Sequence, residues 1–454
     1  MKKRIIAFLL TVFSAVGLLA GCNDDSASSS PEIQEIDYAA SVTLDMSSET
    51  KKQEAEVKLF IDGDTTHFHV PTSISENGVL KARYLAINTP ESTGKIEVWG
   101  KKASNFTKSK LQSATSIILE TDGADWELDS TGDRHLVWVW YKPEGATAYR
   151  NLNIEILQNG LAIASNSEGN RYGETCGKAI KQATDLKLHV HSNEKDPDFY
   201  YGKAQPVDLK ELRLNIADYD GQKVSFEGVV TYLNNNGAYV ENYDEETGIW
   251  YGMYVYYGFS LNAFGQEVLS PMHKVRVVGT VSYYEAGDSW QVSGVDYNMR
   301  NPDDEGSMKD LDPENPTYTP VCLETTVEKF NSNVTIEILS DDEETVEEKE
   351  FAYAQLAMQS SISMKGLKVV STYTTHNGGD SDGAITLTCE DTAGNEITIR
   401  TIVLKDAEGK IVTADKFMNK TIDVKGVIDY FKPEGAEKGG YQVKVFNIEN
   451  ITIH

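Results

Sequence analysis

One strand-like pattern with a central glycine recurs in the second half of the chain. Apolar and polar residues alternate on either side of the glycine, as expected for a strand with one buried face, and a mid-strand glycine suits a tightly bent barrel. We therefore predict two copies of one small β-module, at 205–300 and about 350–454. Two unrelated β-sandwiches remain the alternative, because the pattern is permissive. The three clear copies are VSFEGVVTY at 224–232, VRVVGTVSY at 275–283 and IDVKGVIDY at 422–430.

The first 22 residues have the pattern of an export signal. A basic stretch, Lys2-Lys3-Arg4, precedes an apolar run from Ile5 to Leu19 that is short for a membrane span. The run ends in Leu19-Ala20-Gly21-Cys22, which resembles a bacterial lipobox. We expect Cys22 to be lipidated and to anchor the protein at the outer face of the cell membrane. An ordinary signal peptide with a chance cysteine is the alternative.

Composition divides the rest of the chain into three folded regions of uneven charge. Residues 56–191 hold 15 basic and 17 acidic residues, a net of −2. The two later regions have nets of −9 and −10, so we expect only the first region to handle a polyanion. The predicted parts are a signal peptide at 1–21, a lipidated Cys with a disordered tether at 22–55, a first domain at 56–191, a β-module at 203–305, a linker at 306–318 and a second β-module at 319–454.

Three cysteines follow Cys22, and their spacing supports neither a zinc site nor a disulfide framework. Cys176, Cys322 and Cys389 lie in separate regions. One long-range disulfide between Cys322 and Cys389 is one interpretation, and three buried thiols is the interpretation that we favour.

Four short blocks in the first region carry the residue types that phosphodiester hydrolysis needs. They supply hard oxygen ligands for a cation, a carboxylate that can act as a base, and two arginines for a phosphate. Strand-like runs join them, and helices are predicted at 99–111, 152–157 and 174–188. The blocks are Ile61-Asp62-Gly63-Asp64-Thr65, Arg83-Tyr84-Leu85, Ile87-Asn88-Thr89-Pro90-Glu91 and Asp129-Ser130-Thr131-Gly132-Asp133-Arg134.

The blocks, their order and two supporting motifs, 99–106 and 153–162, resemble the thermonuclease family of staphylococcal nuclease-like domains. The resemblance spans about 56–191. It implies an OB-type five-stranded barrel with three helices, and the later modules are similar to OB folds as well. The whole chain is then mainly β with α, an α+β protein. The resemblance also implies a calcium-dependent endonuclease that attacks DNA and RNA.

The resemblance assigns the metal ligands and the base. The calcium ligands fall on Asp64, the backbone carbonyl of Thr89, and Asn88, where the family usually has Asp. Because calcium affinity follows ligand charge, we expect Asn88 to weaken calcium binding. Asp62 is predicted to cap the turn. Glu91 falls on the general base, which would deprotonate a water molecule.

Arg83 and Arg134 fall on the two phosphate-binding arginines of the family. The composition agrees, since only nine of the 42 basic residues are Arg and the guanidinium provides a bidentate fork. A salt bridge on the sheet surface is the alternative role for Arg83. The family loop usually reads Asp-x-x-Gly-Arg, whereas Asp133 here separates Gly132 from Arg134 and adds negative charge.

The aromatic and histidine residues of the first region are assigned more loosely. The family stacks the base on a tyrosine shortly after Gly-Leu-Ala, and this chain has none there; Tyr141 and Tyr172 are our candidate replacements. His67 and His69 alternate along a strand and are expected to face solvent rather than to bind metal.

We therefore predict a lipid-anchored, extracellular, monomeric endonuclease that hydrolyses DNA with Ca²⁺, with RNA as a second candidate substrate. The alternative is a catalytically weak or silent surface lipoprotein that uses these folds to bind nucleic acid or a protein partner. The aromatic-rich but acidic C-terminal modules are expected to be spacers or to bind a protein or cell-surface partner, because single-strand binding by stacking usually needs a basic groove.

Overall fold

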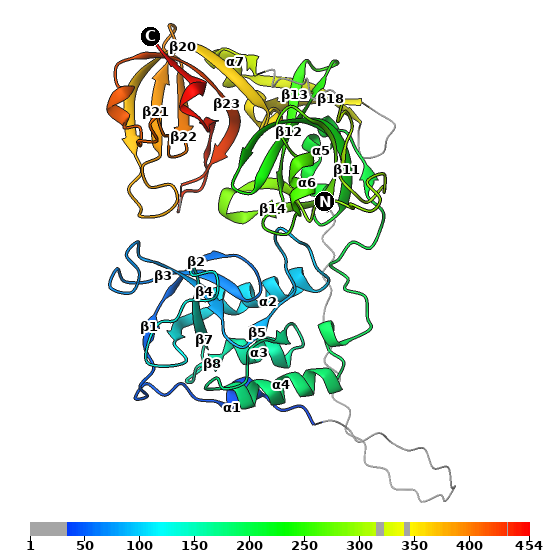
Figure 1. Ribbon diagram of the computed structural model, residues 1–454, viewed down its shortest axis with the longest axis vertical. Helices are drawn as coiled ribbons and strands as arrows, with labels where there is room; N and C mark the ends of the chain where they lie inside the picture. Colours follow the sequence, from blue (N-terminus) through cyan, green and yellow to red (C-terminus); the bar gives the residue numbers. More distant parts are fainter. Residues whose placement is uncertain (1–33, 315–321, 340–345, 434) are drawn as a thin grey trace, which may run out of the picture. The chain divides into compact units, whose positions relative to one another are not determined.

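The computed structural model describes residues 34–314, 322–339, 346–433 and 435–454 (Figure 1). The chain divides into two units, Met1–Ile36 and Asp37–His454. The predicted signal peptide and Cys22 lie outside the described residues. Among the helices of the described ranges, none is long and apolar enough to cross a membrane.

The first β-sheet closes on itself between Lys52 and Pro143. Its order is β1-β6-β7-β4-β3-β2, and β1 and β2 are two halves of one strand interrupted at Ala55. Counted as one strand, they close a five-stranded barrel with the strand order of an OB fold. The strands are β1 (Lys52–Glu54), β2 (Glu56–Phe60), β3 (Thr65–His69), β4 (Val79–Tyr84), β6 (Ala114–Glu120) and β7 (His135–Pro143), with β8 (Arg150–Asn151) beside β7.

Three helices cover this barrel close to the predicted segments 99–111, 152–157 and 174–188. They are α2 (Gly100–Gln112), α3 (Leu152–Gln158) and α4 (Gly173–Asp185). The core between helices and sheet includes Trp138 and Trp140, both fully buried. A short helix, α1 (Tyr38–Ser41), contacts α3 and α4 and buries Ala39 completely. Ordered chain therefore begins before residue 55, and the predicted disordered tether is too long at its C-terminal end.

Two further sheets have the same topology as each other, as the repeated pattern predicted. The second runs β10-β11-β12-β13-β15-β14-β16 and closes through β11 and β14; the third runs β17-β20-β21-β22-β24-β23-β25 and closes through β20 and β23. The second contains β10 (Gln205–Pro206), β11 (Lys223–Asn234), β12 (Gly237–Asp244), β13 (Ile249–Tyr256), β14 (Lys274–Tyr284), β15 (Ser289–Ser293) and β16 (Lys309–Asp310). The third contains β17 (Leu323–Glu324), β20 (Ser361–Thr374), β21 (Ile385–Glu390), β22 (Glu396–Thr401), β23 (Thr421–Phe431), β24 (Gly440–Val445) and β25 (Ile451–Ile453). Both have the closure of an OB barrel, so the predicted α+β fold class is confirmed.

The glycines of the repeated pattern lie where a neighbouring strand comes close. A Cβ on Gly279 would stand 2.8 Å from the carbonyl oxygen of Ser293, and one on Gly426 would stand 2.3 Å from that of Lys444. Any side chain at these positions would push the strands apart. The glycine of the pattern therefore lies where two neighbouring strands of the barrel approach closely, and not in a turn.

The third module also carries an inserted hairpin that the sequence pattern did not predict. It consists of β18 (Asn333–Leu339) and β19 (Val346–Ala352), an antiparallel pair between β17 and β20. The short helices of the C-terminal modules are α5 (Leu209–Leu214), α6 (Ala263–Val268), α7 (Val327–Phe330) and α8 (Tyr353–Leu356).

The three described cysteines are free and buried, so the interpretation as buried thiols is confirmed and the disulfide between Cys322 and Cys389 is not formed. Burial raises the pKa of the Cys176 and Cys389 thiols to about 12. Neither thiol is a reactive nucleophile in this state.

Candidate active site

The loop between β2 and β3 and the end of β4 meet at one end of the first barrel. Thr65 lies opposite Arg83 in the register of β3 and β4, which brings the preceding residue, Asp64, beside Arg83. Gly63 lets the loop pack closely, since a Cβ there would stand 2.8 Å from the side chain of Thr89. The local sequence thus places the first two blocks side by side.

The third block completes this cluster. Asn88 lies on β5 (Ile87–Asn88), which pairs with β9 (Ile163–Ala164) beyond the Gly-Leu-Ala motif. The backbone N–H of Thr89 donates to Oδ2 of Asp64 at 2.8 Å. Arg83 donates from Nη1 to Oδ1 of Asp64 and from Nη2 to Oδ1 of Asn88, the latter at 2.5 Å. Residues that the sequence analysis assigned to metal and phosphate thus share one hydrogen-bonded network.

Asp64 is a buried carboxylate with an unfavourable electrostatic environment. Its residue surface is 0 % exposed. Burial raises its pKa first, the neighbouring Asp62 raises it further, and Arg83 and the N–H of Thr89 lower it. Asp62, also buried, accepts the N–H of Asp64 at 3.1 Å, the turn-capping contact expected for it. A cation bound here would relieve the repulsion between the two carboxylates.

The predicted ligand oxygens are of types that suit a hard cation, and in this structure those of Asp64 and Asn88 accept hydrogen bonds from Arg83 and from the N–H of Thr89. They are the carboxylate of Asp64, the amide oxygen of Asn88 and the backbone carbonyl of Thr89, all ligand types that Ca²⁺ accepts. In the described part of the chain, no group of three or more His, Cys, Asp or Glu side chains could hold a metal ion. A calcium ion here would thus depend on one carboxylate and two neutral oxygens, which fits a weakly held ion.

Glu91 is half-buried at the edge of the same cluster. Burial is the main cause that raises its pKa, Asp62 and Glu97 add to the effect, and Arg83 and Arg134 oppose it. A carboxylate with a raised pKa is a better proton acceptor at neutral pH, as a general base requires. The backbone N–H of Glu91 donates to Oε2 of Glu97 at 3.1 Å.

Glu97 is the contact that the sequence analysis missed. The only signal in the sequence is an acidic residue six positions after the predicted base, in a loop before α2. In a loop, a separation of six residues does not indicate that two side chains are close. Only the folded structure shows that Glu97 accepts the backbone N–H of Glu91.

Arg134 approaches the cluster from the loop before β7. Its Nε donates to Oδ2 of Asp129 at 2.7 Å, and its side chain is 31 % exposed. Its charge reaches Glu91 and lowers the pKa of that residue. Asp133, which the sequence suggested would add negative charge near a phosphate, pairs with Lys81 at 2.8 Å. This ion pair offsets the charge of the additional loop residue.

The two candidate stacking tyrosines have buried partners instead. Tyr141 is 2 % exposed and donates its hydroxyl to Oε2 of Glu155 at 2.6 Å. Its burial argues against the predicted stacking role. Tyr172 donates to Oε2 of Glu120 at 3.0 Å and packs edge-on against Trp138, with ring centroids 5.0 Å apart. Base stacking by Tyr172 stays a prediction.

The histidines of β3 are half-buried, whereas the alternation suggested that they face solvent. His67 lies opposite Lys81 in the register. Burial and then the Lys81 charge lower the pKa of His67 to about 4. His67 is therefore a neutral ring in the folded domain at neutral pH.

Comparison with known protein families identifies the first domain. Residues 81–192 match the family model described as Staphylococcal nuclease homologue. The chain contains a staphylococcal nuclease-like domain. The matched segment includes Arg83, Asn88, Thr89, Glu91 and Arg134, whereas Asp62 and Asp64 precede it. The family supports a phosphodiesterase of the nuclease class with a nucleic acid as substrate. No curated protein matches the chain.

Proposed function

We propose that this protein is a calcium-dependent endonuclease that hydrolyses the phosphodiester bonds of DNA, with RNA as a second substrate. The observation that carries the proposal is the network in which Arg83 donates to both Asp64 and Asn88 while Thr89 holds Asp64. A structural ion pair needs only two partners. Here the network also adjoins a half-buried carboxylate, Glu91, whose pKa is raised.

In the proposed mechanism, Glu91 accepts a proton from the attacking water, which it orients through its half-buried carboxylate. Glu97 accepts the backbone N–H of Glu91 and so holds the backbone from which that carboxylate extends. Arg83 and Arg134 bind phosphate oxygens and stabilise the negative charge that develops there. The Arg83 guanidinium has five N–H donors. One N–H donates to Asp64 and one to Asn88, so the others remain for a phosphate.

Asp64, Asn88 and the carbonyl of Thr89 would hold the calcium ion, which polarises a phosphate oxygen when bound. Asn88 provides one neutral oxygen where a carboxylate would provide charge, so the affinity for calcium should be low. Arg83 contacts two of these three groups, and its positive charge opposes that of the ion.

We further propose that Cys22 is lipidated and that the mature monomer is held at the outer face of the cell membrane. The lipobox-like sequence supports this location. The substrate is then nucleic acid outside the cell.

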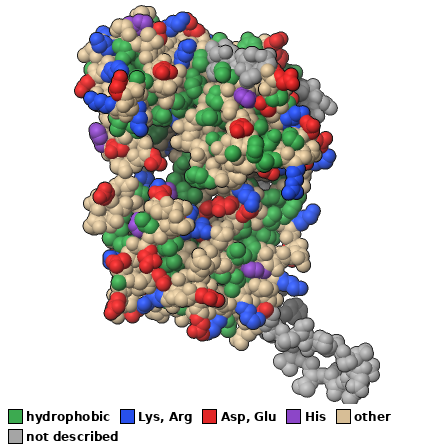
Figure 2. All heavy atoms as spheres, viewed as in Figure 1, with side chains coloured by type: hydrophobic (Ala, Val, Ile, Leu, Met, Phe, Trp, Pro, Cys, Tyr) green, Lys and Arg blue, Asp and Glu red, His purple; other side chains and the backbone are tan. Residues whose placement is uncertain are grey.

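The C-terminal modules are proposed to be spacers or to bind a protein or cell-surface partner. Their formal nets of −9 and −10 repel a polyanion. Figure 2 shows acidic and basic side chains interspersed on the face in view rather than gathered into a basic band. Single-stranded nucleic acid that binds by base stacking usually lies in a basic groove. We do not expect these acidic modules to provide such a groove.

The competing function is a silent surface protein that binds nucleic acid or a protein partner. Asn88 in place of a carboxylate favours it. The joint presence of Asp64, Glu91 and Arg83 in one network opposes it, because binding alone does not require a base.

One digestion experiment separates the two functions. The full mature protein should degrade double-stranded DNA in millimolar calcium and stop on addition of a chelator. The Glu91→Gln variant should bind DNA but cleave it far more slowly. Equal and undetectable cleavage by both proteins, with DNA binding retained, would establish the silent alternative.

A further inference from the structure

A lysine lies beside the candidate active site on the outer face of β4. Every second residue of β4 is buried, and Lys81 and Arg83 are half-buried on the opposite face. The two side chains therefore extend from the same side of the strand, two residues or about 7 Å apart. Lys81 lies outside the hydrogen-bonded network that holds Arg83, and the mechanism above gives it no role.

The strand next to β4 adds a third cation. Strand β7 pairs in parallel with β4, and Ala82 lies opposite His135. The same register places the preceding residue, Arg134, beside Lys81. We call Lys81, Arg83 and Arg134 the cationic strip.

A histidine on the other side of β4 responds to the charge of this face. His67 lies opposite Lys81 in the register of β3 and β4. Burial, and then the positive charges of Lys81 and Lys58, lower the pKa of His67 to about 4 against the opposing effect of Asp133. The ring is neutral at neutral pH, so the positive charge on this part of the face comes from the lysines. Such a face attracts a polyanion.

One exposed contact occupies Lys81. Its Nζ donates to Oδ1 and Oδ2 of Asp133 at 3.0 and 2.8 Å, and the Asp133 side chain is 63 % exposed. An exposed ion pair contributes little to stability, so a phosphate can replace the carboxylate. Asp133 is also the additional residue in the loop before Arg134. The loop therefore places a competing anion at Lys81.

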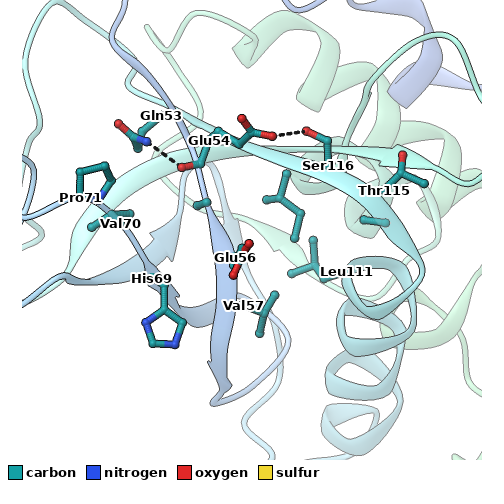
Figure 3. Close-up of a pocket in the computed structure, with 13 residues that line it drawn as sticks. Gln53, Glu54, Glu56, Val57, His69, Val70, Pro71, Leu111, Thr115 and Ser116 are labelled. Atoms are coloured by element: carbon teal, nitrogen blue, oxygen red, sulfur yellow. Dashed lines mark hydrogen bonds between the residues drawn. The ribbon is translucent and has the colours of Figure 1, made fainter. Parts of the chain in front are cut away.

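The far end of the same face has the opposite charge. Figure 3 shows this end of the barrel, where Glu56 and His69 lie on neighbouring strands. The side chains of Glu54 and Glu56 are exposed there and would repel a phosphate. The cationic strip therefore ends at Lys81, which leaves room for one phosphate beyond the one at Arg83.

We propose that Lys81 binds the phosphate next to the scissile one, so that the substrate must carry at least two consecutive phosphates. This inference rests on the proposed nuclease function. Arg83 holds the scissile phosphate, and Lys81 lies about 7 Å along the strand, close to the separation of successive phosphates in an extended nucleic-acid strand. In the complex, the phosphate takes the place of Asp133. The preferred substrate is then an internal bond of a polynucleotide rather than an isolated phosphodiester.

Binding without cleavage tests this placement. A fluorescein-labelled thymidine hexanucleotide is titrated with the full-length protein in the presence of a chelator, and fluorescence anisotropy gives the Kd. Lys81→Gln should weaken binding by roughly two- to five-fold, the effect of one exposed charge contact. It should also reduce the slope of log Kd against log salt concentration by about 0.7, as expected for one lost phosphate contact on a single strand.

The competing carboxylate gives a second variant with the opposite effect. Asp133→Asn should tighten binding of the hexanucleotide, because it removes the anion that occupies Lys81. The gain should be much smaller in the Lys81→Gln background, since the two residues act on the same contact. An equal gain in both backgrounds would mean that Asp133 does not act through Lys81, which contradicts the proposal.

Cleavage in calcium separates a substrate contact from a structural role. Lys81→Gln should raise KM for the hexanucleotide and leave kcat unchanged. It should leave cleavage of thymidylyl-thymidine, which has a single phosphodiester, as in the parent. Lys81→Arg keeps the charge and should retain the affinity of the parent for the hexanucleotide.

The matched control is Lys178→Gln, which removes an exposed, ion-paired lysine on α4 of the same domain. It should bind as the parent does, and circular dichroism should show that all variants fold. The proposal is overturned if folded Lys81→Gln keeps the affinity and salt slope of the parent, or if Lys178→Gln weakens binding equally. If only Lys81→Gln binds more weakly but the parent cleaves nothing in calcium, the nuclease function fails and the phosphate contact stands.

Discussion

The backbone N–H of Thr89 donates to Oδ2 of Asp64 at 2.8 Å, across a separation of 25 residues. This bond joins the loop after β2 to the loop after β5. The candidate metal ligands therefore form one unit in which a shift of either loop moves the carboxylate. Asn88 and Thr89 both belong to this unit, through the hydrogen bonds to Arg83 and Asp64. The block 87–91 therefore contributes two adjacent residues to one site.

Asn88→Asp should lower the calcium concentration that gives half-maximal cleavage, because a carboxylate replaces a neutral amide oxygen beside Asp64. Calcium titration of DNA cleavage measures the effect. Asn105→Asp, which adds the same charge at an exposed position of α2, is the control and should change nothing. An unchanged half-maximal calcium concentration in Asn88→Asp would remove Asn88 from the metal site.

Glu91→Gln should reduce the cleavage rate by about 10²–10⁴, since the amide cannot accept a proton. Its melting temperature should stay near that of the parent because the side chain is only half-buried. Glu76→Gln, at an exposed loop position, is the matched control. Parental turnover by a folded Glu91→Gln protein would show that another group activates water.

Arg83→Gln should reduce cleavage and, at the same time, tighten calcium binding. The guanidinium now contacts Asp64 and Asn88, so its removal takes a competing positive charge away from the proposed ligands. Calorimetry gives the calcium affinity and a cleavage assay gives the rate. Weaker calcium binding in this variant would mean that Arg83 organises the ligands rather than competing for them.

His67 should make the first domain sensitive to acid. Its pKa in the fold is lowered to about 4 from an ordinary value of about 6.5, so the folded domain binds fewer protons than the unfolded chain between these values. Its stabilising contribution is complete above about pH 6.5 and is lost as the pH falls toward 4. His67→Gln should reduce the drop in melting temperature between pH 7 and pH 4.5.

The control for this measurement is His376→Gln, because the His376 side chain is 80 % exposed. It should melt with the same pH dependence as the parent. If His67→Gln also follows the parent curve, the acid sensitivity arises from other groups.

Cys22→Ser should remove the lipid anchor. Mass spectrometry of the parent should detect a diacylglyceryl group on Cys22, and the variant should lack it and leave the membrane fraction or keep its signal peptide. A mature parent protein that starts elsewhere and carries no lipid would refute the proposed tether.

Properties that reside in consecutive residues were predictable from the sequence. The alternation around Gly279 and Gly426 depends on strand geometry alone, and it predicted the two C-terminal barrels. The block 87–91 and Arg83 lie in short segments, and the structure brings Arg83 and Asn88 into hydrogen-bond contact; their assigned roles stay predictions. Apolar spacing predicted α2 and the glycine after residue 159 predicted the end of α3, whereas α4 ends at Asp185, three residues before the predicted end.

Tertiary structure decided which partner each polar side chain has. Asp133 pairs with Lys81, Tyr141 with Glu155, and Glu97 holds Glu91. The first barrel likewise contains register shifts at Val57–Leu59 and at Ala114–Ser116, in strands about 60 positions apart in the sequence. Local sequence determines periodicity and turn chemistry, because these depend on the backbone of a few residues. Contacts between distant segments depend on how the whole barrel closes, and no short pattern in the sequence encodes them.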